Sequence, residues 1–104
     1  MELKHLNKDE FEQAVNADDE LVVDFFATWC GPCKMLGPVI ERAADKFSDV
    51  HFYKVDIDEE MDLAARFQVM SVPTLIYFKR GEVLSKSIGL VSPSDIDKEI
   101  SKLK

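Results

Sequence analysis

The sequence of 104 residues contains little cysteine, tryptophan or glycine: two cysteines, one tryptophan and four glycines. Two cysteines cannot build a framework of several disulfides, which excludes a small secreted fold stabilised in that way. No apolar run approaches the roughly 18 residues that a membrane-spanning helix needs, so we expect no membrane association. The N-terminal residues lack an apolar signal segment, and we therefore expect a cytoplasmic protein.

Positive charge is also scarce. Thirteen lysines and arginines stand against 20 aspartates and glutamates, for a formal net charge of −7. General nucleic-acid binding needs a cationic surface, so this class of function is excluded. Apolar residues make up 46% of the chain, which suits one domain over residues 1–104 with one modest core. There is no repeat or linker, and we expect a monomer.

Both cysteines and the only tryptophan lie in the stretch 29–34, Trp-Cys-Gly-Pro-Cys-Lys. The apolar run 21–27 predicts a strand before this stretch, and the apolar spacing after Cys33 predicts a helix. Cys30 would then be the N-cap of the helix and Cys33 its third residue. Residues at this spacing share one face of a helix, nearly close enough for a disulfide.

The predicted cap favours reactive sulfur at Cys30. An N-cap side chain accepts a hydrogen bond from the amide of the second or third helical residue, and Pro32 has no N–H to offer. A Cys30 thiolate would therefore accept from the Cys33 amide, and the helix dipole would stabilise it further. These effects predict a nucleophile near neutral pH. Cys33 should be less exposed, and it would attack the mixed disulfide formed at Cys30.

A pair of cysteines at this spacing has other interpretations. It could be half of a zinc site, or two inert thiols in the core. His5 and His51 have no motif-like spacing to the cysteines, so we expect no metal. A chain of this kind could also be a non-enzymatic scaffold that holds partner proteins and does not use its thiols.

Asp24 interrupts the run 21–27, which is otherwise apolar on both faces. Such a run is typical of a central strand covered by helices on both sides. Burial of a carboxyl group raises its pKa, because the charged form loses its hydration. Asp24 is thus a candidate proton acceptor for Cys33. The alternative is a carboxyl group in a water-lined gap with no chemical role.

The remaining pattern predicts short elements along the whole chain. Asn7 and Ser92 are expected to cap helices, and one bent helix is expected to continue through Pro38. The acidic stretch 56–62 is read as a favourable start for the next helix. Strands are expected at 2–6, 50–57, 74–79 and 82–88. One helix is expected to begin at residue 8 and the last to begin after residue 92, while the helix after the acidic stretch is expected to end near residue 68.

The stretch 29–34 resembles the active-site signature of thioredoxins. The order strand, helix, strand, helix, strand, helix, strand, strand, helix resembles that family over essentially the whole chain. The matching positions are Asp24, residues 29–34, Pro38, Lys54, Pro73, Gly81 and Gly89. The resemblance implies an α/β thioredoxin fold, with a five-stranded mixed β-sheet sandwiched between four α-helices.

The resemblance also implies a protein-disulfide reductase. Cys30 would be the nucleophile, Cys33 the resolving cysteine and Asp24 the proton acceptor. Lys54 is implied to pair with Asp24 and tune it, although an ordinary exposed strand lysine is the alternative. Pro73 is implied to be cis and to face the cysteine pair, whereas the low frequency of cis X-Pro bonds alone predicts trans.

Partners follow from the same resemblance. The Val72 backbone would pair with an extended segment of the target, as in strand addition. Target proteins, among them reductases and peroxidases, would bind a rim made of Trp29, Gly31, Pro32, Val72, Pro73 and Gly89. The protein would bind no cofactor, and its electrons would come from NADPH through a thioredoxin reductase.

Two positions depart from the family pattern. Phe26 stands where many thioredoxins have a second tryptophan, which we expect to change packing and fluorescence more than chemistry. Met70 and Ser71 replace residues that are often basic or glycine, so we expect an effect on partner preference.

Overall fold

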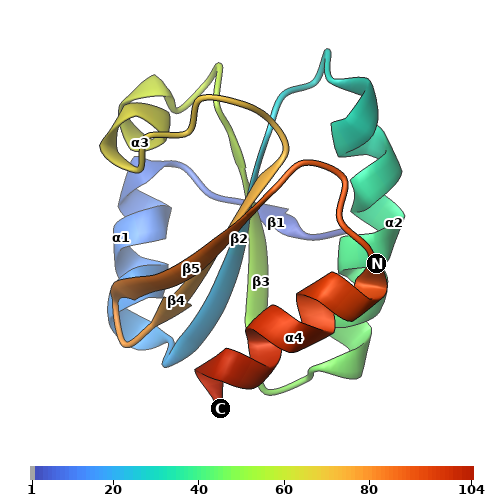
Figure 1. Cartoon of the computed structure of the whole chain (residues 1–104). Coiled ribbons are helices and arrows are strands. Elements are labelled where there is room, and N and C mark those ends of the chain that lie inside the picture. The colour runs from blue at the N-terminus through green and yellow to red at the C-terminus, as the bar shows by residue number, and fades with distance from the viewer. Residues whose placement is uncertain (1) are drawn as a thin grey trace.

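The computed structural model describes residues 2–104, which form five strands and four helices (Figure 1). The bounds are close to those expected from the sequence, apart from a shorter first strand and a shorter third helix. In chain order the elements are β1 (Lys4–His5), α1 (Lys8–Ala17), β2 (Glu20–Phe26), α2 (Gly31–Lys46), β3 (His51–Asp56), α3 (Met61–Arg66), β4 (Thr74–Lys79), β5 (Glu82–Ile88) and α4 (Pro93–Leu103).

The strands form one mixed sheet in the order β1-β3-β2-β4-β5. β1 and β2 both pair with β3 in parallel, whereas β2–β4 and β4–β5 are antiparallel. The central strand β2 places Asp24 beside Lys54 of β3 and Leu75 of β4. The expected five-stranded mixed sheet is therefore confirmed.

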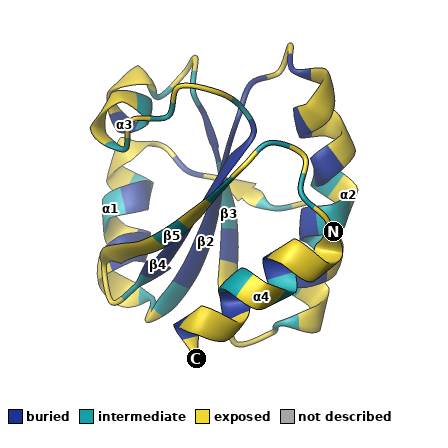
Figure 2. Ribbon diagram, viewed as in Figure 1, coloured by how far each residue is buried: buried dark blue, intermediate teal, exposed yellow. Residues whose placement is uncertain are grey.

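Helices cover both faces of the sheet, with α1 and α3 on one side and α2 and α4 on the other (Figure 1). Their inner surfaces are buried and their outer surfaces exposed (Figure 2). Leu21, Val23 and Phe25 pack toward α1 and α3, while Val22 packs toward α2 and α4. Because side chains alternate along a strand, Asp24 shares the α2 side with Val22.

The expected helix starts are confirmed. Asn7 Oδ1 accepts the N–H of Glu10 at 2.8 Å, and Ser92 Oγ accepts the N–H of Asp95 at 3.1 Å. α2 runs through Pro38 without a break. None of the four described helices is long and apolar enough to cross a membrane.

The end of α3 differs from the expectation, because the helix stops at Arg66 rather than near Gln68. Gln68 has a φ of 56°, in the left-handed region. Its N–H donates to Ala65 O and the N–H of Val69 donates to Ala64 O, which closes the helix in a Schellman arrangement. Glycine usually marks such an end, and here glutamine holds it.

Candidate active site

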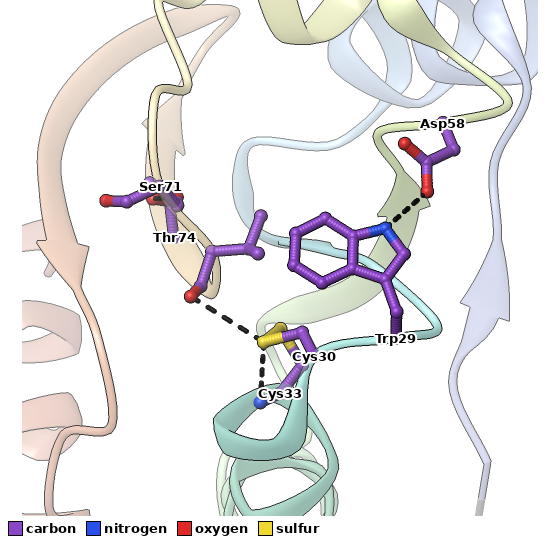
Figure 3. The surroundings of a disulfide bond; sticks show 7 residues. Trp29, Cys30, Cys33, Asp58, Ser71 and Thr74 are labelled. Carbon is purple, nitrogen blue, oxygen red and sulfur yellow. Dashed lines mark hydrogen bonds between the residues drawn. A yellow bond between two sulfur atoms is a disulfide. The ribbon is translucent and has the colours of Figure 1, made fainter.

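The two cysteines lie at the start of α2 and form a disulfide, with their Cα atoms 5.3 Å apart. Cys30 is the N-cap, in an extended conformation with φ −92° and ψ 114°. Its Sγ accepts the backbone N–H of Cys33 at 3.2 Å (Figure 3). Pro32, at the second helical position, has no N–H to compete. The cap expected from the sequence is confirmed.

Both cysteines are nearly buried, with exposed fractions of 5% for Cys30 and 3% for Cys33. They pack against Phe26 and Ala27, with Val72 at the edge of the cluster. The expected difference in exposure between the two cysteines is thus small. Since little of either residue is open to solvent, a substrate disulfide must fit closely against the surrounding surface to reach the sulfur atoms.

The loop before β4 forms the wall that faces Cys30. The Val72–Pro73 peptide bond is cis, as the resemblance implied. The carbonyl oxygen of Val72 lies 3.6 Å from Cys30 Sγ (Figure 3). Thr74 Oγ1 fixes the loop by donating to Ser71 O at 2.7 Å. Gly89, with a φ of 89°, donates its N–H to Pro73 O at 2.8 Å. The end of β5 is thereby joined to the same wall.

Trp29 stands beside the cysteine pair with 68% of its surface exposed. Its indole Nε1–H donates to Asp58 Oδ2 at 2.8 Å (Figure 3). Asp56 Oδ1 in turn accepts the N–H of Asp58 at 2.8 Å. The acidic stretch read from the sequence as a helix start therefore also orients the tryptophan. Sequence reasoning missed Asp58, because nothing local links it to a residue 29 positions away.

Asp24 is completely buried, and neither of its carboxyl oxygens has a hydrogen-bond partner among residues 2–104. Burial raises the pKa of Asp24 from 3.8 to about 7, and the charge of Lys54 counteracts part of this rise. The increase agrees with the expectation from the sequence. A carboxyl group with this pKa can both take up and release a proton near neutral pH.

The resemblance implied that Lys54 pairs with Asp24 and tunes it; the two are register partners and the charge of Lys54 lowers the pKa of Asp24, but no hydrogen bond joins them. Within the described chain no contact between the Lys54 ammonium and the Asp24 carboxyl is close enough for a salt bridge. The Lys54 Nζ lies instead 4.6 Å from the centre of the Phe26 ring. The aromatic face competes for the ammonium group, so Lys54 influences Asp24 through its charge and not through a hydrogen bond.

Comparisons with known proteins agree with this site. The Thioredoxin family model matches residues 2–102. The chain is 47% identical over 93 residues to thioredoxin-2 of Saccharomyces cerevisiae, which is 88% of each protein. It is 40% identical over 101 residues to thioredoxin of Mycoplasmoides gallisepticum, covering 96% of this chain and 100% of that one. This chain belongs to the thioredoxin family.

Solved thioredoxins share the whole fold. The crystal structure of oxidised mitochondrial thioredoxin 3 from Saccharomyces cerevisiae superposes with a TM-score of 0.90 at 39% identity, covering 96% of this chain and 94% of that one. Cys30 and Cys33 occupy the family's active-site position. The protein is therefore a disulfide oxidoreductase that works by thiol–disulfide exchange at this pair.

The structure brings the expected rim of this thioredoxin together around the disulfide. Trp29, Gly31 and Pro32 are exposed beside the cysteines, whereas Val72 and Gly89 are half-buried in the facing wall. Pro73 is buried. Within residues 2–104, no group of three or more histidine, cysteine, aspartate or glutamate side chains has the arrangement of a metal site.

Proposed function

We propose that this thioredoxin reduces disulfides in target proteins through Cys30 and Cys33 and is itself re-reduced by a thioredoxin reductase that uses NADPH. The observation that carries the proposal is the hydrogen bond from the Cys33 amide to Cys30 Sγ at the N-cap of α2. This donor and the positive end of the helix stabilise a thiolate at Cys30 once the pair is reduced. The protein binds no cofactor of its own in this scheme.

The first step uses Cys30. Its thiolate attacks one sulfur of the target disulfide, so that a Cys30–target bond forms and the target S–S bond breaks. The released target sulfur leaves as a thiolate and takes a proton from solvent. The target segment lies against Val72, whose backbone is available for strand-like pairing, and against the exposed face of Trp29.

The second step uses Cys33 and Asp24. The ionised Asp24 carboxyl takes the proton of the Cys33 thiol, and the Cys33 thiolate attacks Cys30 Sγ of the mixed disulfide. The Cys30–Cys33 disulfide forms, the bond to the target breaks, and the second target sulfur leaves to be protonated. Two electrons have then passed to the target, and the dithiol of a thioredoxin reductase returns them.

Targets include peroxidases and other reductases that form a disulfide in their own cycles. One structure with the same fold, at 38% identity and a TM-score of 0.89, concerns thiol resolution in a yeast mitochondrial 1-Cys peroxiredoxin through glutathione and thioredoxin systems. It supports a peroxidase as one class of target for this chain. We place the protein in the cytoplasm as a monomer, although relatives include a mitochondrial thioredoxin.

Reduction of insulin by NADPH and a purified thioredoxin reductase tests the proposal. Cys30→Ser should abolish turnover, whereas Cys33→Ser should trap a mixed disulfide at Cys30 that denaturing, non-reducing electrophoresis detects. Pro38→Ala, which leaves the cysteines in place, is the control for general damage to α2. If Cys30→Ser retained the biological activity of the protein, the scaffold interpretation would replace the reductase.

A further inference from the structure

Phe26 ends β2 and is contacted by side chains from the two strands beyond it. The ring is 7% exposed. The Lys54 Nζ lies 4.6 Å from its centre, within the range of a cation–π interaction. The imidazole of His5 meets the ring edge-on at 5.1 Å between centroids. His5 and Lys54 are partners in the β1–β3 register, so the sheet itself brings both to Phe26.

A small cavity connects this group to the active site. Its volume is about 220 Å³, and its lining includes Phe26, Lys54 and the resolving Cys33. Asp24 lies two residues before Phe26 on the same face of β2 and is the register partner of Lys54. The Phe26 ring therefore holds the Lys54 ammonium at the cavity that Cys33 also lines. In the sheet, Lys54 is the neighbour of Asp24 on β2.

We propose that Phe26 is a positioning residue for the exchange reaction: its ring keeps the Lys54 ammonium at this cavity, where the positive charge favours the ionised Asp24 that accepts the Cys33 proton. The inference deepens the proposed function and rests on the role that it gives to Asp24.

The need for positioning follows from the flexibility of lysine. Its side chain has four rotatable bonds and its ammonium group is strongly hydrated, so a half-buried strand lysine also has solvent-directed conformations. In solvent, salt screens its charge over roughly 8–10 Å at ordinary ionic strength, and water weakens its effect on Asp24 further. The aromatic face offers a competing site on the side of the sheet where Asp24 lies, since Phe26 and Asp24 share one face of β2. The charge of Lys54 lowers the pKa of Asp24 against the effect of burial, which gives the positioning a chemical consequence.

Other charged or titratable groups lie near the Phe26 ring and its cavity, and their effects on Asp24 must be distinguished from that of Lys54. Lys34 of α2 lines the same cavity, and His5 of β1 lies on the far edge of Phe26. Asp56 of β3 is paired in register with Phe26, but its carboxyl accepts the N–H groups of its own turn. The neighbouring position on β4 is the uncharged Leu75. Because the His5 imidazole also contacts the Phe26 ring, the test is repeated with His5→Asn.

The experiment follows the carboxyl carbon of Asp24 by ¹³C NMR during pH titration of the reduced protein. Phe26→Leu removes the aromatic face and keeps an apolar side chain. A cation–π contact of this kind changes the population of the held lysine roughly two- to fivefold. We therefore expect the titration midpoint of Asp24 to rise by at most roughly 0.3–0.7 pH units, in the same direction as in Lys54→Gln.

Two further variants identify the cause. Phe26→Trp should restore the original midpoint, because tryptophan is the strongest aromatic partner for a cation. In a Lys54→Gln background, Phe26→Leu should add no further change. Phe47→Leu is the matched control, since Lys46 lies 5.3 Å from the Phe47 ring at the opposite end of α2. It should leave the titration of Asp24 unchanged.

An unchanged midpoint in Phe26→Leu would overturn the inference, as would an equal rise in the Lys54→Gln background. If Phe26→Leu does not fold, Phe26→Met gives the same comparison. The rate at which Cys33 resolves a trapped mixed disulfide is measured against pH in parallel. If Asp24→Asn left that profile unchanged, the proposed role of Asp24 would fail, while the NMR midpoints would still report whether Phe26 positions Lys54.

Discussion

Replacing Asp24 by asparagine should stabilise the protein by an amount that depends on pH. The carboxyl group is completely buried and unpartnered within residues 2–104. Its pKa is raised from 3.8 to about 7. Each pKa unit corresponds to about 1.4 kcal/mol, so the ionised carboxyl costs about 4 kcal/mol of stability. Asparagine has nearly the same shape and carries no charge at any pH.

The direction of the change in stability with pH follows from proton binding. Between pH 4 and 7 the unfolded chain has already lost the proton of Asp24, whereas the folded protein keeps it. Stability from this group is therefore fully present below about pH 4 and is lost as the pH rises to about 7. Asp24→Asn removes the dependence. We expect little difference from the parent protein near pH 4 and about 4 kcal/mol of extra stability at pH 8.

Guanidinium denaturation of both oxidised proteins at a series of pH values measures this difference. All other titrating groups are shared, so the subtraction isolates Asp24. Asp56→Ala is a useful contrast, because this second buried carboxyl accepts two backbone N–H groups and its loss should destabilise the protein by about 1–2 kcal/mol. A stability difference between parent and Asp24→Asn that is the same at pH 4 and pH 8 would refute the reasoning.

Three other predictions concern single side chains. Asp58→Ala removes the acceptor of the Trp29 indole N–H, so the tryptophan fluorescence should change and the rate of insulin reduction should fall severalfold; an unchanged spectrum would contradict the role of this bond. Asn7→Ala removes the cap on the Glu10 amide and should cost about 1 kcal/mol in denaturation of the oxidised protein. Met70→Lys should alter stability by less than about 0.5 kcal/mol, since Met70 is 95% exposed, while changing relative reduction rates among target proteins.

The helix starts could be predicted because their signals are local. Asn7, Cys30 and Ser92 each make their cap bond with the residue three positions later. Both partners of such a cap bond lie within four consecutive residues, so a local sequence pattern is enough to predict it. The most reactive feature of the site belongs to this class, so the chemistry of Cys30 could be inferred before the fold was known.

The contacts that surround the cysteines could not be predicted in the same way. Asp58 reaches Trp29 across 29 positions, and His5 and Lys54 reach Phe26 only because β1 and β3 lie beside β2 in the sheet. Strand order is not contained in the periodicity of any one segment. The tuning of Asp24 by Lys54 could be expected from the resemblance, but the contact of the ammonium with the Phe26 ring could not, because it depends on the fold.

Two unusual backbone conformations could not be predicted from the residues alone either. Gln68 ends α3 with a positive φ, and no glycine or proline marks that position. The cis bond before Pro73 runs against the general preference for trans, and only the resemblance to thioredoxins predicted it. Both features depend on the surrounding structure, which determines these conformations against the intrinsic preference of the residues.

Among residues 2–104, neither carboxyl oxygen of Asp24 has a hydrogen-bond partner that would explain its presence by stability. An apolar residue at this position would remove the unpartnered carboxyl group from the core. Above pH 7 it would also remove a destabilisation of about 4 kcal/mol, which is a large part of the 5–15 kcal/mol free energy of unfolding typical of a folded protein. A purely structural residue would lose stability and activity together on replacement. Asp24→Asn should instead raise stability at pH 8 and slow the resolution of the mixed disulfide by Cys33 in the same sample. Opposite effects in one variant are the signature of a group retained for proton transfer, and parallel losses would assign Asp24 to the fold.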